Sequence, residues 1–247
     1  MKSSQPNHLW IRRSLAWGVH LFTASGAVWG FLALLAIFQA QWRAAILWMV
    51  LAMLVDGFDG MLARWADVKT YAKGIDGALL DNILDYFNYV IVPALFLYMA
   101  PNMLPYGFTL AGAISILLTS AYQFTQSDAK TDDHFFKGFP SYWNVMVLYM
   151  LILNTNPWVN LGFLVFFNIL VFVPVKYIYP SRTSFLRKLT LTLTYIYSVF
   201  GIWGLMQYPD VPKWVAYGSF LYVAYYIVVS LLPKKSESDL LVAGDAN

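Results

Sequence analysis

The sequence contains no cysteine, and charged residues make up only 12% of its 247 residues. Without cysteine, the chain has no disulfide framework, no thiolate metal site and no cysteine nucleophile. Soluble domains carry about 25% charged residues. A chain with so little charge and 60% hydrophobic residues has too much apolar surface to bury in a soluble fold. The composition therefore excludes an ordinary soluble domain and indicates an integral membrane protein.

Long apolar runs predict an all-α, polytopic membrane protein. A helix needs about 20 mostly apolar residues to cross a bilayer. We expect eight such spans, and together they form a transmembrane domain over residues 19–232. Their approximate bounds are 19–39, 43–64, 76–99, 103–125, 141–154, 157–176, 188–207 and 213–232.

Two polar segments flank this predicted domain. Residues 1–18 include an Arg12–Arg13 pair among apolar residues, which suits a short helix in the headgroup layer, and a flexible leader is the alternative. No small-residue cleavage pattern follows, so the first span should remain in the mature protein. Residues 233–247 are polar with a basic start and should form a disordered tail at the cytosolic surface.

The positions of the basic residues predict the orientation. If the N-terminus lies in the cytosol, fourteen of the sixteen lysines and arginines lie on the cytosolic side, and only Arg43 and Lys213 lie outside. This distribution follows the positive-inside rule. We therefore expect both termini to be cytosolic.

Acidic residues gather in one short stretch. Six of the thirteen lie between residues 56 and 85, and no aspartate or glutamate lies inside any other predicted span. Asp56, Asp59, Asp81 and Asp85 lie in otherwise apolar helix, where an ionisable side chain is costly and marks a candidate functional site.

The second predicted span carries two of these carboxylates on one face. At about 100° per residue, Asp56, Asp59, Gly60 and Ala63 share one arc, with Arg64 at its edge. Small residues beside carboxylates allow a ligand to approach the backbone closely. This face therefore suits a bound ligand.

The third predicted span carries the other two carboxylates. Gly77, Asp81 and Asp85 recur at a spacing of four, so they lie on one face of a helix. A short cytosolic loop joins the two spans. We expect antiparallel neighbours whose aspartate faces meet.

Four carboxylates at close range would repel one another strongly unless cations neutralised them. Oxygen ligands favour Mg²⁺ or Mn²⁺ over zinc. Two divalent cations would also suit phosphoryl chemistry, because a metal pair can clamp the oxygens of a transferring phosphate. The alternative is a set of interfacial salt bridges to Arg64, Lys69 and Lys73, which leaves the small residues unexplained.

These residues form a long pattern that resembles the signature of the CDP-alcohol phosphotransferase family. It reads Asp56-x2-Asp59-Gly60-x2-Ala63-Arg64, a gap of twelve, then Gly77-x3-Asp81-x3-Asp85. The gap is longer than is usual in the family and resembles that of the bacterial phosphatidylcholine synthases. Residues 135–144 and 173–182 also resemble segments of that subgroup.

The resemblance implies an enzyme of the bacterial inner membrane whose active site faces the cytosol. Its substrates would be CDP-diacylglycerol and choline, which give phosphatidylcholine and CMP. The implied partners are thus these substrates and membrane lipid, with no nucleic acid. Relatives often dimerise, so a homodimer is among the expected arrangements.

The resemblance also implies roles for individual residues. Asp56, Asp59, Asp81 and Asp85 would hold two Mn²⁺ or Mg²⁺ ions, and Asp85 would accept the proton of the choline hydroxyl. The residues that would bind CDP are Gly60, Ala63, Arg64, Gly77, Thr70 and Thr23. A packing role is the alternative for Thr23, and we interpret His20 as an ordinary interfacial histidine.

Choline is a quaternary ammonium ion, and proteins usually bind such ions against the faces of aromatic rings. Most of the 10 Trp, 17 Tyr and 18 Phe should serve as membrane anchors or in packing. The aromatics near the cytosolic side are Tyr86, Tyr89, Tyr122, Phe135, Phe136, Phe139, Tyr142, Trp143, Tyr177 and Tyr179. We select Tyr86, Tyr142, Trp143, Tyr177 and Tyr179 as choline-binding candidates, and Lys137 and Arg182 as phosphate-binding candidates or membrane anchors.

Two other functions fit part of the pattern. Phosphatidylserine synthase shares the donor, but a serine carboxylate calls for an arginine or lysine in the acceptor site. An ion-coupled transporter would carry ionisable groups toward the outer face. That half of the chain has only Arg43, Asp210 and Lys213, all near its rim.

Overall fold

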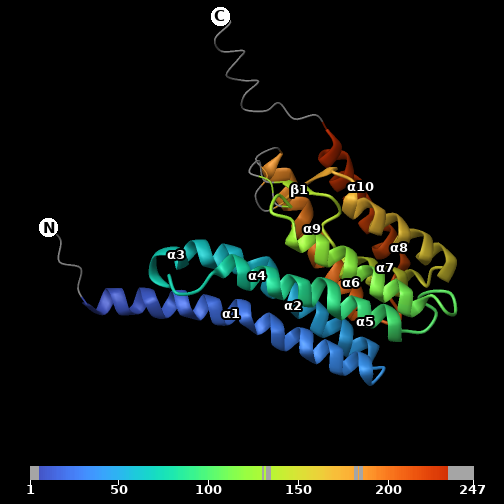
Figure 1. Cartoon of the computed structure of the whole chain (residues 1–247), viewed down its shortest axis with the longest axis horizontal. Helices are drawn as coiled ribbons and strands as arrows, with labels where there is room; N and C mark the ends of the chain where they lie inside the picture. Colours follow the sequence, from blue (N-terminus) through green and yellow to red (C-terminus); the bar gives the residue numbers. More distant parts are fainter. Residues whose placement is uncertain (1–5, 130, 132–134, 181–182, 184–185, 233–247) are drawn as a thin grey trace, which may run out of the picture.

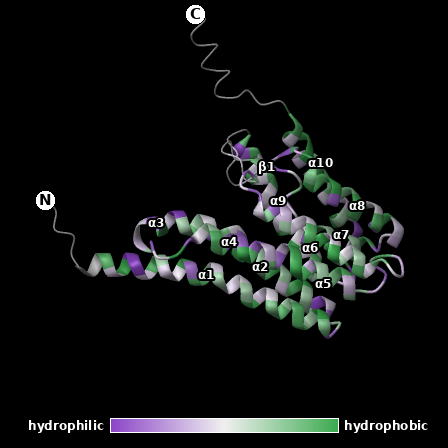
Figure 2. Ribbon diagram, viewed as in Figure 1, coloured by the Kyte–Doolittle hydropathy of each residue, from purple (hydrophilic) through white to green (hydrophobic). Residues whose placement is uncertain are grey.

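The computed structural model describes residues 6–129, 131, 135–180, 183 and 186–232. Most of these residues are helical, and hydrophobic residues run along most of the helices (Figure 2). The helices long and apolar enough to cross a bilayer number five within this part of the chain, and they cover residues 9–38, 42–65, 77–99, 187–206 and 213–231. These lengths fit a polytopic membrane protein.

The N-terminal half lies along one side of the fold, with α1 at its edge (Figure 1). Helix α1 (Pro6–Phe38) turns back at Gln39–Gln41 into α2 (Trp42–Trp65). Alanines at their interface, among them Ala33, Ala36 and Ala45, are almost fully buried. Small side chains let two helices approach closely in a membrane, where packing rather than water exclusion holds them together.

The third predicted span is one continuous helical rod with a local widening. It contains α4 (Gly77–Tyr86), the π-helical turn η1 (Phe87–Ile91) and α5 (Val92–Met99). Asp76 caps its start, because its carboxylate accepts bonds from the backbone N–H groups of Ala78 and Leu79, each at 3.0 Å. The short helix α3 (Val68–Tyr71) lies between α2 and α4.

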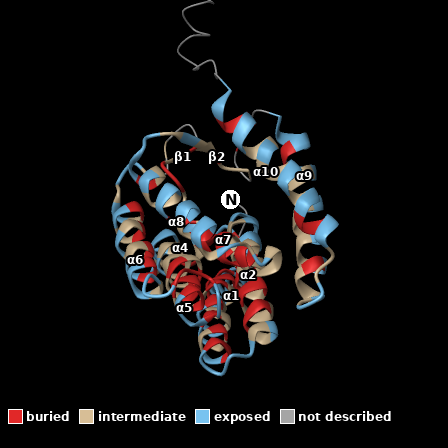
Figure 3. Cartoon of the chain, turned by 90° about the vertical axis from the view of Figure 1, so that its right-hand side faces the viewer, coloured by how far each residue is buried: buried red, intermediate tan, exposed pale blue. Residues whose placement is uncertain are grey.

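The C-terminal half adds shorter helices and then a separate helix pair. Its first part contains α6 (Thr109–Thr125), α7 (Trp143–Leu153) and α8 (Pro157–Phe172). Helices α9 (Arg187–Met206) and α10 (Lys213–Leu231) then pack against each other, beside the rest of the fold (Figure 3). Helix α9 contacts α2, and α10 contacts α7.

A two-stranded antiparallel sheet joins two distant loops. Strand β1 (Phe135–Lys137) pairs with β2 (Lys176–Ile178), so that Phe136 lies opposite Tyr177. The two strands lie in the segments 135–144 and 173–182, whose sequences resemble those of the subgroup. The sheet therefore brings the strand residues of both segments together.

Several bounds differ from those predicted. The proposed interfacial helix is not separate, because α1 runs unbroken from Pro6 with no proline to interrupt it. The predicted fourth span starts late, at Thr109, and α7 has 11 residues. At 1.5 Å per residue, α7 is about 16 Å long, short of the roughly 30 Å of a bilayer core. Residues 1–5 and the predicted tail, 233–247, lie outside the described residues.

Gly138 ends β1 in a conformation that glycine favours. Its φ is +78°, and a Cβ atom there would lie 2.5 Å from the carbonyl oxygen of Val171. Its own N–H donates to the carbonyl of Val175 at 2.9 Å. The residue thus fixes the loop that leads from β1 into α7.

We expect Gly138→Ala to destabilise the fold by about 1–3 kcal/mol, because it adds a backbone clash to a strained φ. Thermal unfolding in detergent measures the effect. Gly107→Ala is the matched control, since Gly107 also has a positive φ, +84°, but has nothing near its Cβ position. Equal melting temperatures for the two variants would contradict this account of Gly138.

Candidate functional site

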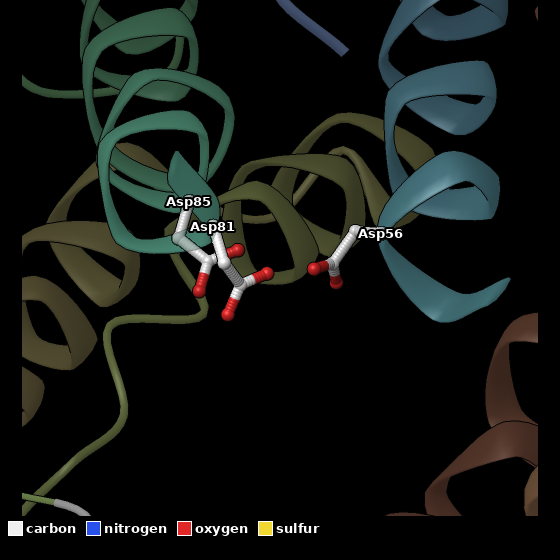
Figure 4. A group of neighbouring side chains, drawn as sticks. All are labelled: Asp56, Asp81 and Asp85. Carbon is white, nitrogen blue, oxygen red and sulfur yellow. The ribbon is translucent and has the colours of Figure 1, made fainter. Parts of the chain in front are cut away.

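Three aspartates from two helices converge on one point. One carboxylate oxygen each from Asp56 of α2 and from Asp81 and Asp85 of α4 lies within 4.8 Å of the others. Figure 4 shows the three carboxylates turned toward the same space. The aspartate faces of α2 and α4 thus meet at these three residues.

Asp59 lies apart from this group. Its side chain is buried, and the Thr23 hydroxyl of α1 is within hydrogen-bonding reach of it. The charges of Asp81 and Asp56 still act on it. Asp59 therefore connects the group to α1, although its carboxylate is not among those that lie within 4.8 Å of one another.

Tyr89 orients Asp56. Its hydroxyl donates a hydrogen bond of 2.6 Å to Oδ2 of Asp56. Tyr89 lies in the π-helical turn η1, and such turns are frequent at functional sites. The helix that supplies Asp81 and Asp85 therefore also holds the carboxylate that α2 contributes.

A cavity of about 250 Å³ opens beside the carboxylates. The three carboxylates line it together with five aromatic residues, which are Tyr89, Phe124, Phe136, Tyr142 and Tyr179. The ring centroids lie 4.7 Å apart for Phe136 and Tyr179, 6.5 Å for Phe136 and Tyr142, and 6.2 Å for Tyr89 and Tyr142. None of the described lining residues is lysine or arginine. This wall is aromatic and acidic.

The short sheet places two of these rings. Phe136 belongs to β1, and Tyr179 follows β2 directly. Tyr142 lies just before α7, in the same loop as Gly138. Two chain segments about 40 residues apart in the sequence thus face the aspartates from one side.

The other side of the aspartates is built from α1, α2 and the start of α4. A Cβ atom on Gly60 would have only the Arg64 guanidinium near it, at 3.4 Å. A Cβ atom on Gly77 would lie 3.2 Å from Cε1 of His20. Ala63 is half-buried, Arg64 and Thr70 are exposed, and Thr23 is buried against Asp59. Gly60 thus leaves room beside α2, whereas the ring of His20 packs closely against Gly77 on α4.

His20 lies at the edge of this room with one ring nitrogen unused. Its side chain is 8% exposed, and Nε2 has no hydrogen-bond partner among the described residues. A buried polar atom without a partner is destabilising. His20 thus differs from the ordinary interfacial histidine expected from the sequence.

Three predicted choline-binding aromatics lie outside the cavity. Trp143 is fully buried, and its Nε1 donates to Oγ of Ser120 at 2.7 Å. The hydroxyl of Tyr86 donates to the carbonyl of Leu117 at 3.0 Å, and Tyr177 stacks on Tyr226. All three side chains therefore make hydrogen bonds or ring contacts elsewhere in the protein.

Lys137, one of the two predicted phosphate-binding residues, does not line the cavity either. Lys137 forms an ion pair of 2.5 Å with Asp128, and this lysine lowers the pKa of the Asp128 carboxyl. Arg182 lies outside the described residues. The structure therefore gives Lys137 a partner in its own loop.

Polar residues that the sequence reasoning missed complete the cavity. Asn82, Gln123 and Gln126 line it. Gln123 also donates to the carbonyl of Lys137 at 2.8 Å and so ties α6 to β1. A single glutamine in an apolar helix gives no pattern, so no sequence signal pointed to Gln123.

Comparisons with known proteins point to one family. The family model for CDP-alcohol phosphatidyltransferase matches residues 20–203. A Legionella pneumophila protein named phosphatidylcholine synthase is 47% identical over 222 residues, which is 87% of this chain and 87% of that protein. Proteins of the same name are 42% identical in Borreliella burgdorferi, over 74% of this chain and 77% of that protein, and 38% identical in Pseudomonas aeruginosa, over 82% and 85%.

We expect Tyr89→Phe to weaken Mn²⁺ binding about 10-fold, because residues that orient metal ligands typically contribute about 10- to 100-fold to metal affinity. Titration with Mn²⁺, followed by the electron paramagnetic resonance signal of the free ion, measures this. Tyr86→Phe is the matched control, since its hydroxyl bonds to a backbone carbonyl instead. Unchanged affinity in Tyr89→Phe would show that Asp56 needs no such orientation.

Proposed function

The chain belongs to the CDP-alcohol phosphatidyltransferase family, and we propose that it transfers a phosphatidyl group from CDP-diacylglycerol to choline, with release of CMP. The name that its relatives share supports this reaction. The observation that carries the proposal is the aromatic cavity that opens on three carboxylates. In such a cavity, aromatic rings that can bind a quaternary ammonium ion lie beside carboxylates that suit phosphoryl transfer.

The carboxylates suit divalent cations. Asp56, Asp81 and Asp85 offer oxygen ligands only, within 4.8 Å of one another, and this donor set fits Mg²⁺ or Mn²⁺. We propose two ions, with Asp59 as the fourth ligand residue. Bound cations would stabilise the charge that develops on the transferring phosphate and on the leaving CMP.

The chain's own residues place and deprotonate the acceptor. The choline oxygen forms a bond to the phosphorus that carries diacylglycerol, and the bond from that phosphorus to the CMP oxygen breaks. Asp85 lines the cavity and accepts the proton of the choline hydroxyl in this proposal. A proton acceptor must lie within hydrogen-bond reach of the acceptor hydroxyl, which the cavity wall allows.

The acceptor's cationic head fits the aromatic wall. Tyr142 and Tyr179 keep their predicted role, and Tyr89 and Phe136 join them. A cation over aromatic faces gains about 0.5–2 kcal/mol per favourable contact. Serine, the acceptor of the alternative reaction, carries a carboxylate that an aromatic and acidic wall would repel.

The donor's nucleotide fits the opposite side. We propose that CDP lies beside Gly60, Ala63 and Gly77, with Arg64, Thr70 and Thr23 as polar contacts. His20 joins them, because its ring lies against Gly77 and its buried Nε2 lacks a partner in the part of the chain that the structure describes. A nucleotide would provide that partner.

The reaction also needs a particular topology. The acyl chains of the donor stay in the bilayer while its cytidine reaches water, so the site must lie at a membrane boundary. We propose eight spans within residues 19–232, both termini in the cytosol and the site at the cytosolic face of a bacterial inner membrane. The distribution of lysine and arginine supports this orientation.

A direct assay tests the reaction. Purified protein with CDP-diacylglycerol and Mn²⁺ should convert labelled choline to phosphatidylcholine and release an equal amount of CMP. Labelled serine in place of choline should give no lipid product. Turnover of serine and not choline would overturn the proposal.

We expect Asp81→Asn to lower the rate more than about 100-fold, since loss of a ligand should exceed the roughly 10- to 100-fold effect of an orienting residue. The rate of phosphatidylcholine formation is the readout, with expression and melting temperature measured alongside. Asp67→Asn is the matched control, because Asp67 is exposed in the loop before α3. Full activity of Asp81→Asn would remove Asp81 from the site.

We expect His20→Ala to raise the KM for CDP-diacylglycerol about 10-fold, the effect of one lost hydrogen bond of about 1.4 kcal/mol. The KM for choline should not change, and His20→Gln should restore part of the donor affinity. Ser25→Ala on the same helix is the control, since its hydroxyl bonds to the carbonyl of Phe22. Equal effects on both KM values would assign His20 a structural role.

A further inference from the structure

The last helix, α10, lies beside the short sheet that carries part of the aromatic wall (Figure 3). The family model matches residues 20–203, so the match ends before α10 begins at Lys213. We propose that α10 is a positioning element for the acceptor, because its Tyr226 and Ser230 hold β2 so that Tyr179 stays in the cavity wall. The inference rests on the proposed function and adds a determinant of acceptor binding that lies outside the cavity.

Both backbone polar groups of Ile178, the last residue of β2, bond to side chains of α10. Its N–H donates to Oγ of Ser230 at 3.0 Å, and its carbonyl accepts from the hydroxyl of Tyr226 at 3.2 Å. Ile178 is 0% exposed, and a buried backbone group without a partner is costly. Helix α10 therefore supplies the partners that the end of β2 needs.

The residues that contact β2 lie on one face of α10. Tyr226 and Ser230 are four residues apart, and the Ser230 hydroxyl donates to the carbonyl of Tyr226 at 2.7 Å. Val229, on the same face, belongs to the same buried cluster as Ile178. The ring of Tyr226 also stacks on Tyr177, with the centroids 6.2 Å apart. Polar and apolar contacts thus fix β2 on this face.

The strand passes this constraint on to the cavity. The residue after Ile178 is Tyr179, which lines the cavity and lies 4.7 Å from Phe136 between ring centroids. None of the described residues of α10 lines the cavity, so the helix acts on an acceptor only through the residues it contacts. The attraction between a cation and a ring requires the cation within about 6 Å of the ring centroid. A shift of β2 would therefore weaken acceptor binding.

The donor side of the site is built from other elements. Small residues and His20 of α1, α2 and α4 form it, whereas α10 packs mainly on α9, α7 and β2. Loss of the bonds between α10 and β2 should therefore affect the acceptor and spare the donor. A general loss of packing would affect both substrates.

Tyr226→Phe and Ser230→Ala test the proposal, because each removes one hydrogen bond to Ile178. We expect each variant to raise the KM for choline about 5-fold, the usual effect of one lost hydrogen bond. The KM for CDP-diacylglycerol should not change. Ser230→Thr keeps a hydroxyl at this position and should restore the KM for choline of the parent chain.

Tyr225→Phe and Ser219→Ala are the matched controls on the same helix. The hydroxyl of Tyr225 bonds to Thr190 of α9 at 2.7 Å, and that of Ser219 bonds to Tyr149 of α7. Each control thus loses a hydroxyl bond that does not involve β2. Melting temperatures in detergent should be similar for all these variants. A rise in the KM for choline in the controls equal to that in Tyr226→Phe would overturn the proposal.

Hydrogen–deuterium exchange of the peptide that contains Ile178 reports on β2 without any turnover. We expect faster exchange in Ser230→Ala than in the parent chain and no change in Ser219→Ala. Unchanged exchange in Ser230→Ala, or an unchanged KM for choline in both test variants, would overturn the proposal even if the parent chain makes phosphatidylcholine.

The same variants separate this proposal from the proposed function. If the parent chain uses another alcohol and not choline, the proposed function fails, and the KM for that alcohol becomes the readout. A rise of that KM in Tyr226→Phe, with the KM for the donor unchanged, would support the role of α10. No rise would overturn it.

Discussion

The mutual repulsion of three carboxylates is the constraint on which the site depends. Two unit charges 4.8 Å apart repel by about 3 kcal/mol at an effective dielectric of about 20. Asp56, Asp81 and Asp85 therefore need a positive charge between them at neutral pH. Tyr89 holds Asp56 in place, and Asp76 caps the helix that supplies Asp81 and Asp85. The helices thus keep like charges together, which favours the binding of cations.

The surroundings of the carboxylates differ on their two sides. One side, formed by α1, α2 and the start of α4, has small residues and His20. The other, formed by β1, β2 and the loop before α7, has aromatic rings. A nucleotide and a quaternary ammonium ion need these two environments, and the phosphate between them belongs at the carboxylates.

Helical periodicity predicted which aspartates share a face of a helix. It could not predict which residues of other elements they contact. The spacing of four between Asp81 and Asp85 predicts a shared face, and the structure shows both facing Asp56. Periodicity does not say which neighbour a residue meets, so it could not separate Asp59, which lies against Thr23. Strands of three residues are too short for a recognisable alternation, so the pairing of β1 with β2 was missed. Aromatic abundance likewise could not distinguish Tyr142 from its neighbour Trp143, because only burial separates them.

Anomalous X-ray diffraction from crystals grown with Mn²⁺ tests the central claim most directly. The account predicts anomalous peaks within coordination distance of the carboxylates of Asp56, Asp81 and Asp85, bordering the aromatic cavity. Asp81→Asn crystals should lose or weaken them. A manganese ion bound at another place, with none among these three carboxylates, would contradict the account.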